Sequence, residues 1–392
     1  MKINRYITLD FSLLILLILF GTYLALTSGY GSDEDTLPMI GVFQGILKNG
    51  IVMSSRFTGY PVPELGIGFL AHNFGSWATN LATFSFFIAG IIFFYLALNK
   101  DIIFQNCVTF LLLCLTSPIL FFDNIEPIDY SWAFLFFSMG LFCLKKKFFE
   151  FSVLFFGLCI GTRINFTPFI LASIYLFDYG QHITLKRKTG LFLCSFIIGG
   201  LFYLTIWYQN HFGLEWLTSA RPVNQGLFGL LSRFIYKTVL SIGPIFFIFI
   251  IGLFLKKRNY LKKFENFNLV TFIILLNLLI FIYIPAEMSY LQPMLICLFF
   301  LLNTVFSKKI IYVLIFINLF SWFIDVSFLK INYRSANTCD NVEAISADLN
   351  IELKKGKLSQ FYSTRNRIVE CWIKNEERGK IIANGGALKN SK

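Results

Sequence analysis

The sequence predicts an all-α polytopic membrane protein, and three observations carry this prediction. Hydrophobic residues make up 56% of the 392 residues, charged residues make up only 14%, and phenylalanine occurs 49 times. These proportions exclude an ordinary soluble domain. The apolar residues form long runs, and the basic residues cluster in the loops between them. The net charge of +12 therefore indicates orientation in a membrane rather than binding to nucleic acid.

About eleven apolar segments have the composition of transmembrane helices. They are residues 7–26, 77–98, 102–122, 131–144, 148–162, 164–177, 190–208, 240–255, 267–284, 291–306 and 310–329. No small-residue cleavage site follows the first segment, which favours an uncleaved helix over a signal peptide. The segments 148–162 and 164–177 are short for full crossings, so two crossings and a re-entrant pair are both open. We expect one transmembrane domain over residues 1–329.

The basic residues of the loops predict the orientation of these helices. Sixteen Lys and Arg residues fall on one side. The opposite side has six, namely Lys48, Arg56, Arg163, Arg221, Arg233 and Lys237. Because cytoplasmic loops are enriched in Lys and Arg, we expect a cytoplasmic N-terminus in the plasma (inner) membrane. The loop 28–76 and the tail would then be extracytoplasmic.

The first outer loop, residues 28–76, holds the richest chemistry. Asp33, Glu34 and Asp35 are adjacent carboxylates that repel one another at a membrane surface. This repulsion indicates a bound cation, a bound proton or a catalytic role. Helical spacing of apolar residues over 37–47 predicts an interfacial helix that ends at Asn49-Gly50. Next, Tyr60-Pro61-Val62-Pro63 predicts a rigid, extended turn that brings Arg56 and Glu64 to the same surface.

Further ionisable residues are predicted at the outer ends of later helices. Asp123, Glu126 and Asp129 share one loop, so the outer side would present an acidic cavity mouth. Arg163 lies between two apolar halves, and a charge at membrane depth is a functional candidate. A structural ion pair between Arg163 and one of the acids is an equal alternative.

Two later segments add weaker candidates. Arg233 and Lys237, four residues apart in a predicted interfacial helix over 227–239, share a face that could meet a phosphate. Snorkelling of both side chains to the lipid headgroups is the favoured alternative. Glu287 and Tyr290 lie between prolines at the outer end of a predicted span.

Residues 330–392 form a polar tail, which we expect to be a small extracytoplasmic domain. Its pattern predicts an amphipathic helix over 341–355 and strands over 361–374. Cys339 and Cys371 would lie outside and could form a disulfide, whose loop closure is worth roughly 3 to 4 kcal/mol. Two free thiols are the alternative.

The residue types narrow the chemistry. The sequence has no His-rich metal set, P-loop, GxSxG elbow or dinucleotide fingerprint, and it has only three histidines. Carboxylates and isolated arginines remain. This combination suits activation of a hydroxyl by a carboxylate base while cations hold a departing phosphate.

Several segments of the chain resemble those of a known family. The first helix, the DEDT sequence, the helical segment ending in NG and SRFTGYPVPELGIGFLAHNFG resemble the start of GT-C glycosyltransferases. The resembled branch contains the protein O-mannosyltransferases and lipid A aminoarabinose transferases. Its catalytic acid matches Asp35, with Asp33 and Glu34 one register away, although the branch has Glu where this chain has Thr36. IDYSWAFLFF, GLCIGTRINFTPFIL and EMSYLQPML are similar to later motifs and match Asp129, Arg163, Glu287 and Tyr290.

The resemblance implies transfer of a sugar from a polyprenyl-phosphate donor to an unknown acceptor at the outer leaflet, with inversion. Arg163, Arg56, Arg233 and Lys237 would hold the donor phosphate, and Tyr60, Glu64, Glu126, Glu287 and Tyr290 would contact substrate. No cofactor or bound metal is expected, although the acids at 33–35 could hold a divalent cation.

Two other functions remain open. A transporter or flippase of lipid-linked saccharides would share the hydrophobicity, but the sequence shows no internal repeat. A non-catalytic assembly protein on a GT-C scaffold would have no need of Asp35 and Asp129.

Overall fold

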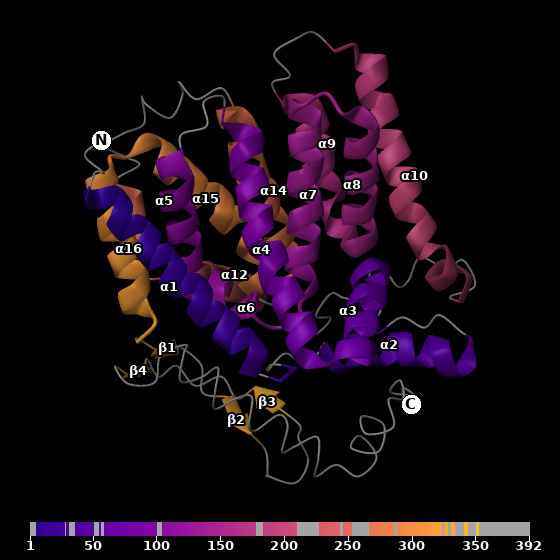
Figure 1. Cartoon of the computed structure of the whole chain (residues 1–392), viewed down its shortest axis with the longest axis horizontal. Helices are drawn as coiled ribbons and strands as arrows, with labels where there is room; N and C mark the ends of the chain where they lie inside the picture. Colours follow the sequence, from indigo (N-terminus) through magenta and orange to yellow (C-terminus); the bar gives the residue numbers. More distant parts are fainter. Residues whose placement is uncertain are drawn as a thin grey trace.

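The computed structural model describes most of the apolar chain. The described residues are 5–27, 29–30, 36–50, 55, 59–99, 104–177, 183–209, 227–243, 246–252, 266–285 and 288–323, with four short strands at 325–327, 331–333, 341–343 and 350–352. They are nearly all helical, and most of the helices stand side by side in one bundle (Figure 1). The all-α prediction is therefore confirmed for the apolar part of the chain.

The helices follow the predicted apolar segments closely. They are α1 (Arg5–Thr27), α2 (Thr36–Asn49), α3 (Pro61–Phe74), α4 (Ser76–Leu98), α5 (Phe104–Thr116), α6 (Pro118–Asp123), α7 (Asp129–Lys145), α8 (Phe149–Thr162), α9 (Thr167–Leu176), α10 (Leu185–Gln209), α12 (Leu227–Ile242), α14 (Phe267–Tyr283), α15 (Gln292–Val305) and α16 (Lys308–Ser321). The 3-10 helices η1 (Ile164–Phe166) and η2 (Met288–Leu291) precede α9 and α15.

Within the described residues, four helices are long and apolar enough to cross a membrane, or five if a bent pair counts as one span. Four shorter apolar helices of 10–17 residues add to them. The chain is an integral membrane protein, and the number of eleven crossings stays a prediction. So does the choice between two crossings and a re-entrant pair over 148–177.

Two predicted segments are divided differently in the structure. The segment 102–122 is broken at Ser117, after which Pro118 begins α6. Proline suits a first helical position because its missing N–H would have no partner there. The predicted segment 240–255 is not one straight helix. The predicted interfacial helix over 227–239 continues to Ile242, and the chain then bends by 88° into a helix over 246–252. Gly243 has a φ of +89° at this bend, a conformation that glycine adopts readily.

Aromatic packing and small residues hold the bundle together. Phe94 of α4 contacts Phe134 of α7 and Phe300 of α15, with ring centroids 5.4 Å and 5.7 Å apart. Gly157 of α8 allows α10 to approach, since a Cβ atom there would lie 2.4 Å from a side-chain atom of Ile198. Close contacts of this kind are the main source of helix association in lipid, where the hydrophobic effect between helices is weak.

The two ends of the bundle carry different polar groups. Lys145, the last residue of α7, donates hydrogen bonds to the carbonyls of Leu96, at 2.7 Å, and of Asn99. A cation there suits the negative end of the α4 dipole. Asp129 begins α7 at the opposite end, where α2 lies across the bundle (Figure 1). The predicted cytoplasmic and outer residues of α7 thus lie at opposite ends.

The first outer loop contains two helices. α2 confirms the helix predicted over 37–47, and it ends at Asn49, directly before Gly50, whose φ is +64°. The extended turn predicted at residues 60–63 is wrong, because α3 begins at Pro61. The first helical turn needs no N–H groups as intrahelical donors, so Pro61 and Pro63 fit it.

The described tail residues form two antiparallel strand pairs, β1 (Asp325–Ser327) with β4 (Asn350–Glu352) and β2 (Ile331–Tyr333) with β3 (Asn341–Glu343). The helix predicted over 341–355 is therefore wrong. Both Asn-Val-Glu and Asn-Ile-Glu place one β-branched residue between polar ones, which suits a strand. The strands predicted over 361–374 lie outside the described residues.

Candidate active site

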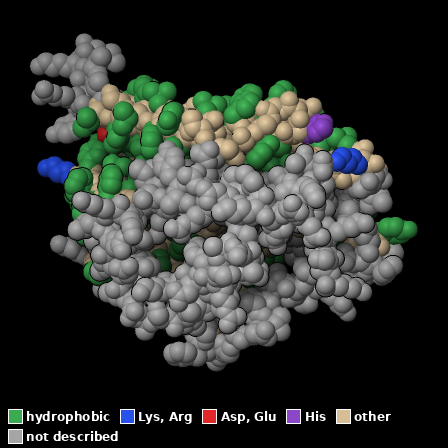
Figure 2. Space-filling view, turned by 90° about the horizontal axis from the view of Figure 1, so that it is seen from below, with side chains coloured by type: hydrophobic (Ala, Val, Ile, Leu, Met, Phe, Trp, Pro, Cys, Tyr) green, Lys and Arg blue, Asp and Glu red, His purple; other side chains and the backbone are tan. Residues whose placement is uncertain are grey.

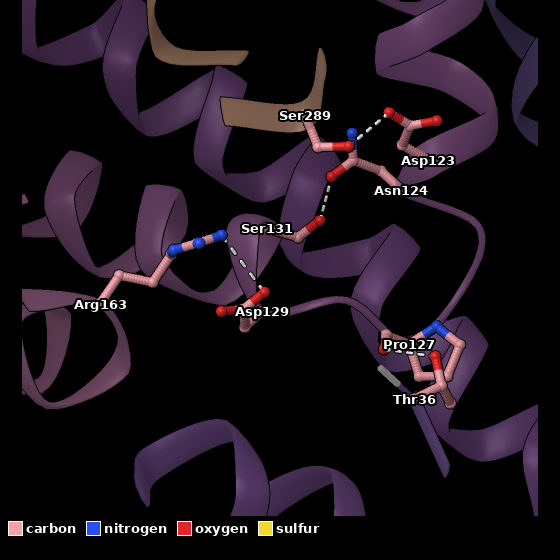
Figure 3. Close-up of polar contacts among 8 residues, drawn as sticks. All are labelled: Thr36, Asp123, Asn124, Pro127, Asp129, Ser131, Arg163 and Ser289. Carbon is pink, nitrogen blue, oxygen red and sulfur yellow. Dashed lines mark hydrogen bonds and ion pairs between the residues drawn. The ribbon is translucent and has the colours of Figure 1, made fainter. Parts of the chain in front are cut away.

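A buried ion pair marks the end of the bundle where α2 lies. Arg163 Nη1 lies 3.4 Å from Asp129 Oδ1, and the two side chains are only 2% and 1% exposed. Figure 3 shows the guanidinium pointing at the carboxylate. Two predicted residues separated by 34 positions therefore meet, and the ion pair considered as the structural alternative for Arg163 is present.

Helix ends place both charges. Asp129 is the first residue of α7, after the extended residue Ile128, and an acid in the first helical turn suits the positive end of the helix dipole. Arg163 follows α8 in an extended conformation, with φ −148° and ψ 111°. Both side chains thus reach the same region from the ends of two helices packed side by side.

Three tyrosines surround the guanidinium of Arg163. The distances from Arg163 Cζ to the ring centroids are 3.6 Å for Tyr130, 4.8 Å for Tyr290 and 5.1 Å for Tyr60. We call these three residues the tyrosine cage. Aromatic faces attract a cation, most strongly where water is excluded. Tyr60 and Tyr290 were predicted candidates, whereas Tyr130 was missed, although it directly follows Asp129 in the sequence.

Hydrogen bonds fix η2, which carries Tyr290. The hydroxyl of Ser289 donates to Asp123 Oδ2 at 2.8 Å, and Asn277 Nδ2 donates to the carbonyl of Tyr290 at 3.0 Å (Figure 3 shows the first bond). The hydroxyl of Ser131 donates to Asn124 Oδ1 beside them. Asp123 thus has a positioning contact that its place in the sequence did not reveal.

The first outer loop packs onto the same end of the bundle. Met39 of α2, Ile67 and Ala71 of α3 and Trp132 of α7 form one apolar cluster. The contact is close, since a Cβ atom on Gly66 would lie 2.6 Å from the ring of Trp132. α2 and α3 are therefore attached to the helix that begins with Asp129.

Two predicted carboxylates of this region are buried. Glu64 is 1% exposed and accepts hydrogen bonds from the backbone N–H of Ser55, at 3.0 Å, and from its hydroxyl. It thereby holds the residue that directly precedes Arg56. Glu126 is 5% exposed in the loop before α7. Their substrate contacts remain predictions.

Arg233 and Lys237 lie on α12, which packs against both η2 and α14. Both side chains are half-buried. Phe234 between them contacts Phe281 of α14, with ring centroids 6.0 Å apart. The two cations therefore lie on a helix that adjoins the element carrying Tyr290.

Several predicted site residues lie outside the described residues, namely Asp33, Glu34, Asp35, Arg56, Glu287, Cys339 and Cys371. Their neighbours in sequence are described: Thr36 follows Asp35, Ser55 precedes Arg56, and Met288 follows Glu287. The acidic cluster, residues 33–35, is thus attached to the described start of α2.

The hydrogen-bonding capacity of the Arg163–Asp129 ion pair is only partly used. Among the residues that the structure describes, Asp129 Oδ2 and Arg163 Nε are buried and have no hydrogen-bond partner. A buried polar atom without a partner is costly, so the pair has capacity for one more donor and one more acceptor.

In the described part of the chain, no group of three or more His, Cys, Asp or Glu residues could hold a metal ion.

Comparison with known proteins identifies a similar fold. No family model and no curated protein matches the sequence significantly. The structure is similar to ArnT from Cupriavidus metallidurans bound to undecaprenyl phosphate, with a TM-score of 0.59, 14% identity, and coverage of 79% of this chain and 62% of that chain. For the apo state of the same protein the TM-score is 0.55 and the identity 13%, over 77% and 61% of the two chains.

The chain thus has the fold of ArnT, a lipid A aminoarabinose transferase of the GT-C type, and spans about three fifths of its length. This confirms, at the level of fold, the branch that the sequence motifs resemble.

Proposed function

We propose that this protein is a membrane glycosyltransferase that moves a sugar from a polyprenyl-phosphate donor to an acceptor hydroxyl. The observation that carries the proposal is the buried Arg163–Asp129 pair inside the tyrosine cage, at one end of an ArnT-like fold. A structure of ArnT holds undecaprenyl phosphate, which is the leaving group that such a donor would release.

The proposed reaction is a displacement at the anomeric carbon of the donor. A carboxylate takes the proton of the acceptor hydroxyl, whose oxygen then bonds to the anomeric carbon. The bond from that carbon to the phosphate oxygen breaks, and the polyprenyl phosphate leaves with its electron pair. Attack from the opposite face inverts the anomeric configuration. Asp35 is the proposed base, with Asp33 and Glu34 as alternatives.

The departing phosphate gains negative charge and needs fixed cations at membrane depth. Arg163 is held in place by Asp129 and the cage, so it would stabilise this charge without reorganising. Arg56, Arg233 and Lys237 would supply further positive charge. Tyr60, Tyr290, Glu64, Glu126 and Glu287 are the proposed substrate contacts around them.

The proposed reaction needs no cofactor. Carboxylates at 33–35 are suitable oxygen ligands for Mg²⁺ or Mn²⁺. A chelator added to the transfer assay distinguishes metal-free transfer from transfer that needs a divalent cation. We place the site on the extracytoplasmic face of the plasma membrane, because the loops at its end of the bundle carry few of the basic residues.

A transporter or flippase of lipid-linked saccharides is the main competing function. It would move the donor across the membrane and leave the sugar–phosphate bond intact. A non-catalytic assembly protein would do neither. Release of free polyprenyl phosphate together with a glycosylated product therefore distinguishes the transferase from the other two functions. Movement of the intact donor across the membrane distinguishes those two from each other.

The proposal is tested with membranes that contain the protein and receive defined polyprenyl-phosphate sugars. Asp35→Asn retains size and most hydrogen bonding but removes basicity, so we expect transfer to be abolished with little loss of donor binding. Asp10→Asn is the matched control, because Asp10 is a buried acid of α1 outside the proposed site. Its Oδ2 accepts a hydrogen bond from the hydroxyl of Tyr312 at 2.9 Å.

An active Asp35→Asn protein with an inactive Asp33→Asn or Glu34→Gln protein would move the base to that residue. Full transfer by all three variants would rule out a base in this loop and, with it, the proposed mechanism.

A further inference from the structure

Thr36 links two segments that are distant in sequence. It is the first residue of α2 and is fully buried. Its hydroxyl donates a hydrogen bond to the carbonyl oxygen of Pro127 at 3.3 Å, across 91 positions of the chain. Figure 3 shows this contact beside the Arg163–Asp129 pair.

The acceptor of this bond is available for structural reasons. Ile128 is the cap residue of α7, so the carbonyl of Pro127 lies before the helix and outside its ladder of hydrogen bonds. A side chain from another element can therefore occupy it. Because Thr36 is buried, water is a poor substitute for the lost partner if the hydroxyl is removed.

Each end of the bond carries a group of the proposed site. Asp35 directly precedes Thr36, and Asp129 follows Pro127 by two residues. The contact between Thr36 and Pro127 therefore joins the start of the helix after the acidic cluster to the loop that leads into the ion pair.

We propose that Thr36 is a positioning residue that sets the acidic cluster at the distance from the Arg163–Asp129 pair that sugar transfer requires. This inference rests on the proposed function. Thr36 would touch no reacting atom and would act through the backbone of residues 35–36.

The residue type supports this role. An ionised carboxylate at this position could not donate a hydrogen bond to the carbonyl of Pro127. Threonine has a short hydroxyl that donates, carries no charge and fits a buried position.

Alignment has a large effect on rate in reactions of this kind. A base must come within about 2.6–3.2 Å of the proton that it takes. A displacement of about 1 Å can cost roughly 100-fold in rate. Donor binding depends on cations elsewhere in the site and should change much less.

Thr36→Val tests the inference because valine retains the shape and lacks the hydroxyl. We expect kcat to fall about 10- to 100-fold while KM for the polyprenyl-phosphate sugar stays nearly unchanged. Thr36→Ser should restore most of the rate. Thr116→Val is the matched control, since Thr116 is also fully buried but donates to Leu112, at 2.7 Å, within its own helix α5.

A second measurement is independent of activity. Hydrogen–deuterium exchange of the peptide covering residues 36–43 should be faster in Thr36→Val than in the unsubstituted protein, and Thr36→Ser should reverse this. The control Thr116→Val should leave that peptide unchanged.

The outcomes separate the two claims. Faster exchange with a normal kcat would overturn the positioning role and leave the proposed function intact. Unchanged exchange and kcat in Thr36→Val would overturn both the link and the role. A third outcome is that the unsubstituted protein transfers no sugar, while exchange is still faster in Thr36→Val. This result would confirm the link and count against the proposed function.

Discussion

At the scale of single residues, Arg163 is a buried charge whose partners the structure defines. It is buried, paired with one carboxylate and enclosed by three aromatic rings. Removing one partner of a buried pair typically costs about 3–5 kcal/mol, because the other charge stays buried alone. Arg163 therefore contributes to folding as well as to the proposed chemistry, and a test must separate the two.

Arg163→Ala should lower the turnover of sugar transfer by about 100-fold or more, the size of effect expected for a lost donor to a developing anion. Arg163→Lys should recover part of the loss, since it retains the charge but not the planar stacking on the tyrosines. Turnover is measured per mole of folded protein, with folding checked by size-exclusion chromatography.

The control is Arg187→Ala, because Arg187 also lies over an aromatic ring, that of Phe149 at 4.2 Å, but at the end of α8 away from Arg163. A folded Arg163→Ala protein that retains full turnover would reject the role of Arg163 at the phosphate.

At the scale of elements, the contact between α2 and α3 depends on a glycine. A Cβ atom on Gly68 of α3 would lie 2.4 Å from Cβ of Phe43 in α2, so the two helices would have to separate. Since α2 begins directly after the acidic cluster, its position relative to α7 bears on the proposed base. The packing of these helices is thus part of the site.

Gly68→Ala should destabilise the protein by about 1–3 kcal/mol through overpacking and should lower the rate of transfer. A thermal melt in detergent measures the first effect. Gly200→Ala in α10 is the matched control, because a Cβ atom there meets no atom within 4 Å. Equal melting temperatures for the two variants would mean that α2 and α3 are less closely packed than the structure has them.

At the scale of the whole molecule, the charge asymmetry of the loops predicts that the tail is extracytoplasmic. A thiol reagent that cannot cross membranes should therefore label Cys339 or Cys371 in intact cells after reduction. Replacing both residues with serine should abolish this labelling. Labelling that requires permeabilised cells would reverse the orientation and place the site on the cytoplasmic face.

Much of this architecture follows from the amino-acid sequence. Hydropathy is a local property, so the runs of apolar residues predict the membrane class and nearly all of the long helices. Gly50 ends the helix predicted over 37–47 for an equally local reason. The prolines at 61 and 63 predict an extended turn wrongly, because the same φ angle suits both an extended turn and a first helical turn. In the structure they begin α3, which packs closely against Trp132 and Phe43.

The partner of Arg163 is a property of the tertiary structure. Asp123, Glu126 and Asp129 lie within seven residues. The motif resemblance favours Asp129 as a site residue, but the sequence does not determine which of the three pairs with Arg163. In the structure Asp123 bonds to Ser289, whereas Asp129 pairs with Arg163 inside the tyrosine cage. The sequence alone thus determined a membrane-embedded helical protein with acids and arginines at its helix ends. The packing of α7, α8, α3 and η2 decided which of them meet, because an ion pair depends on distances between segments that hydropathy and helix propensity do not encode.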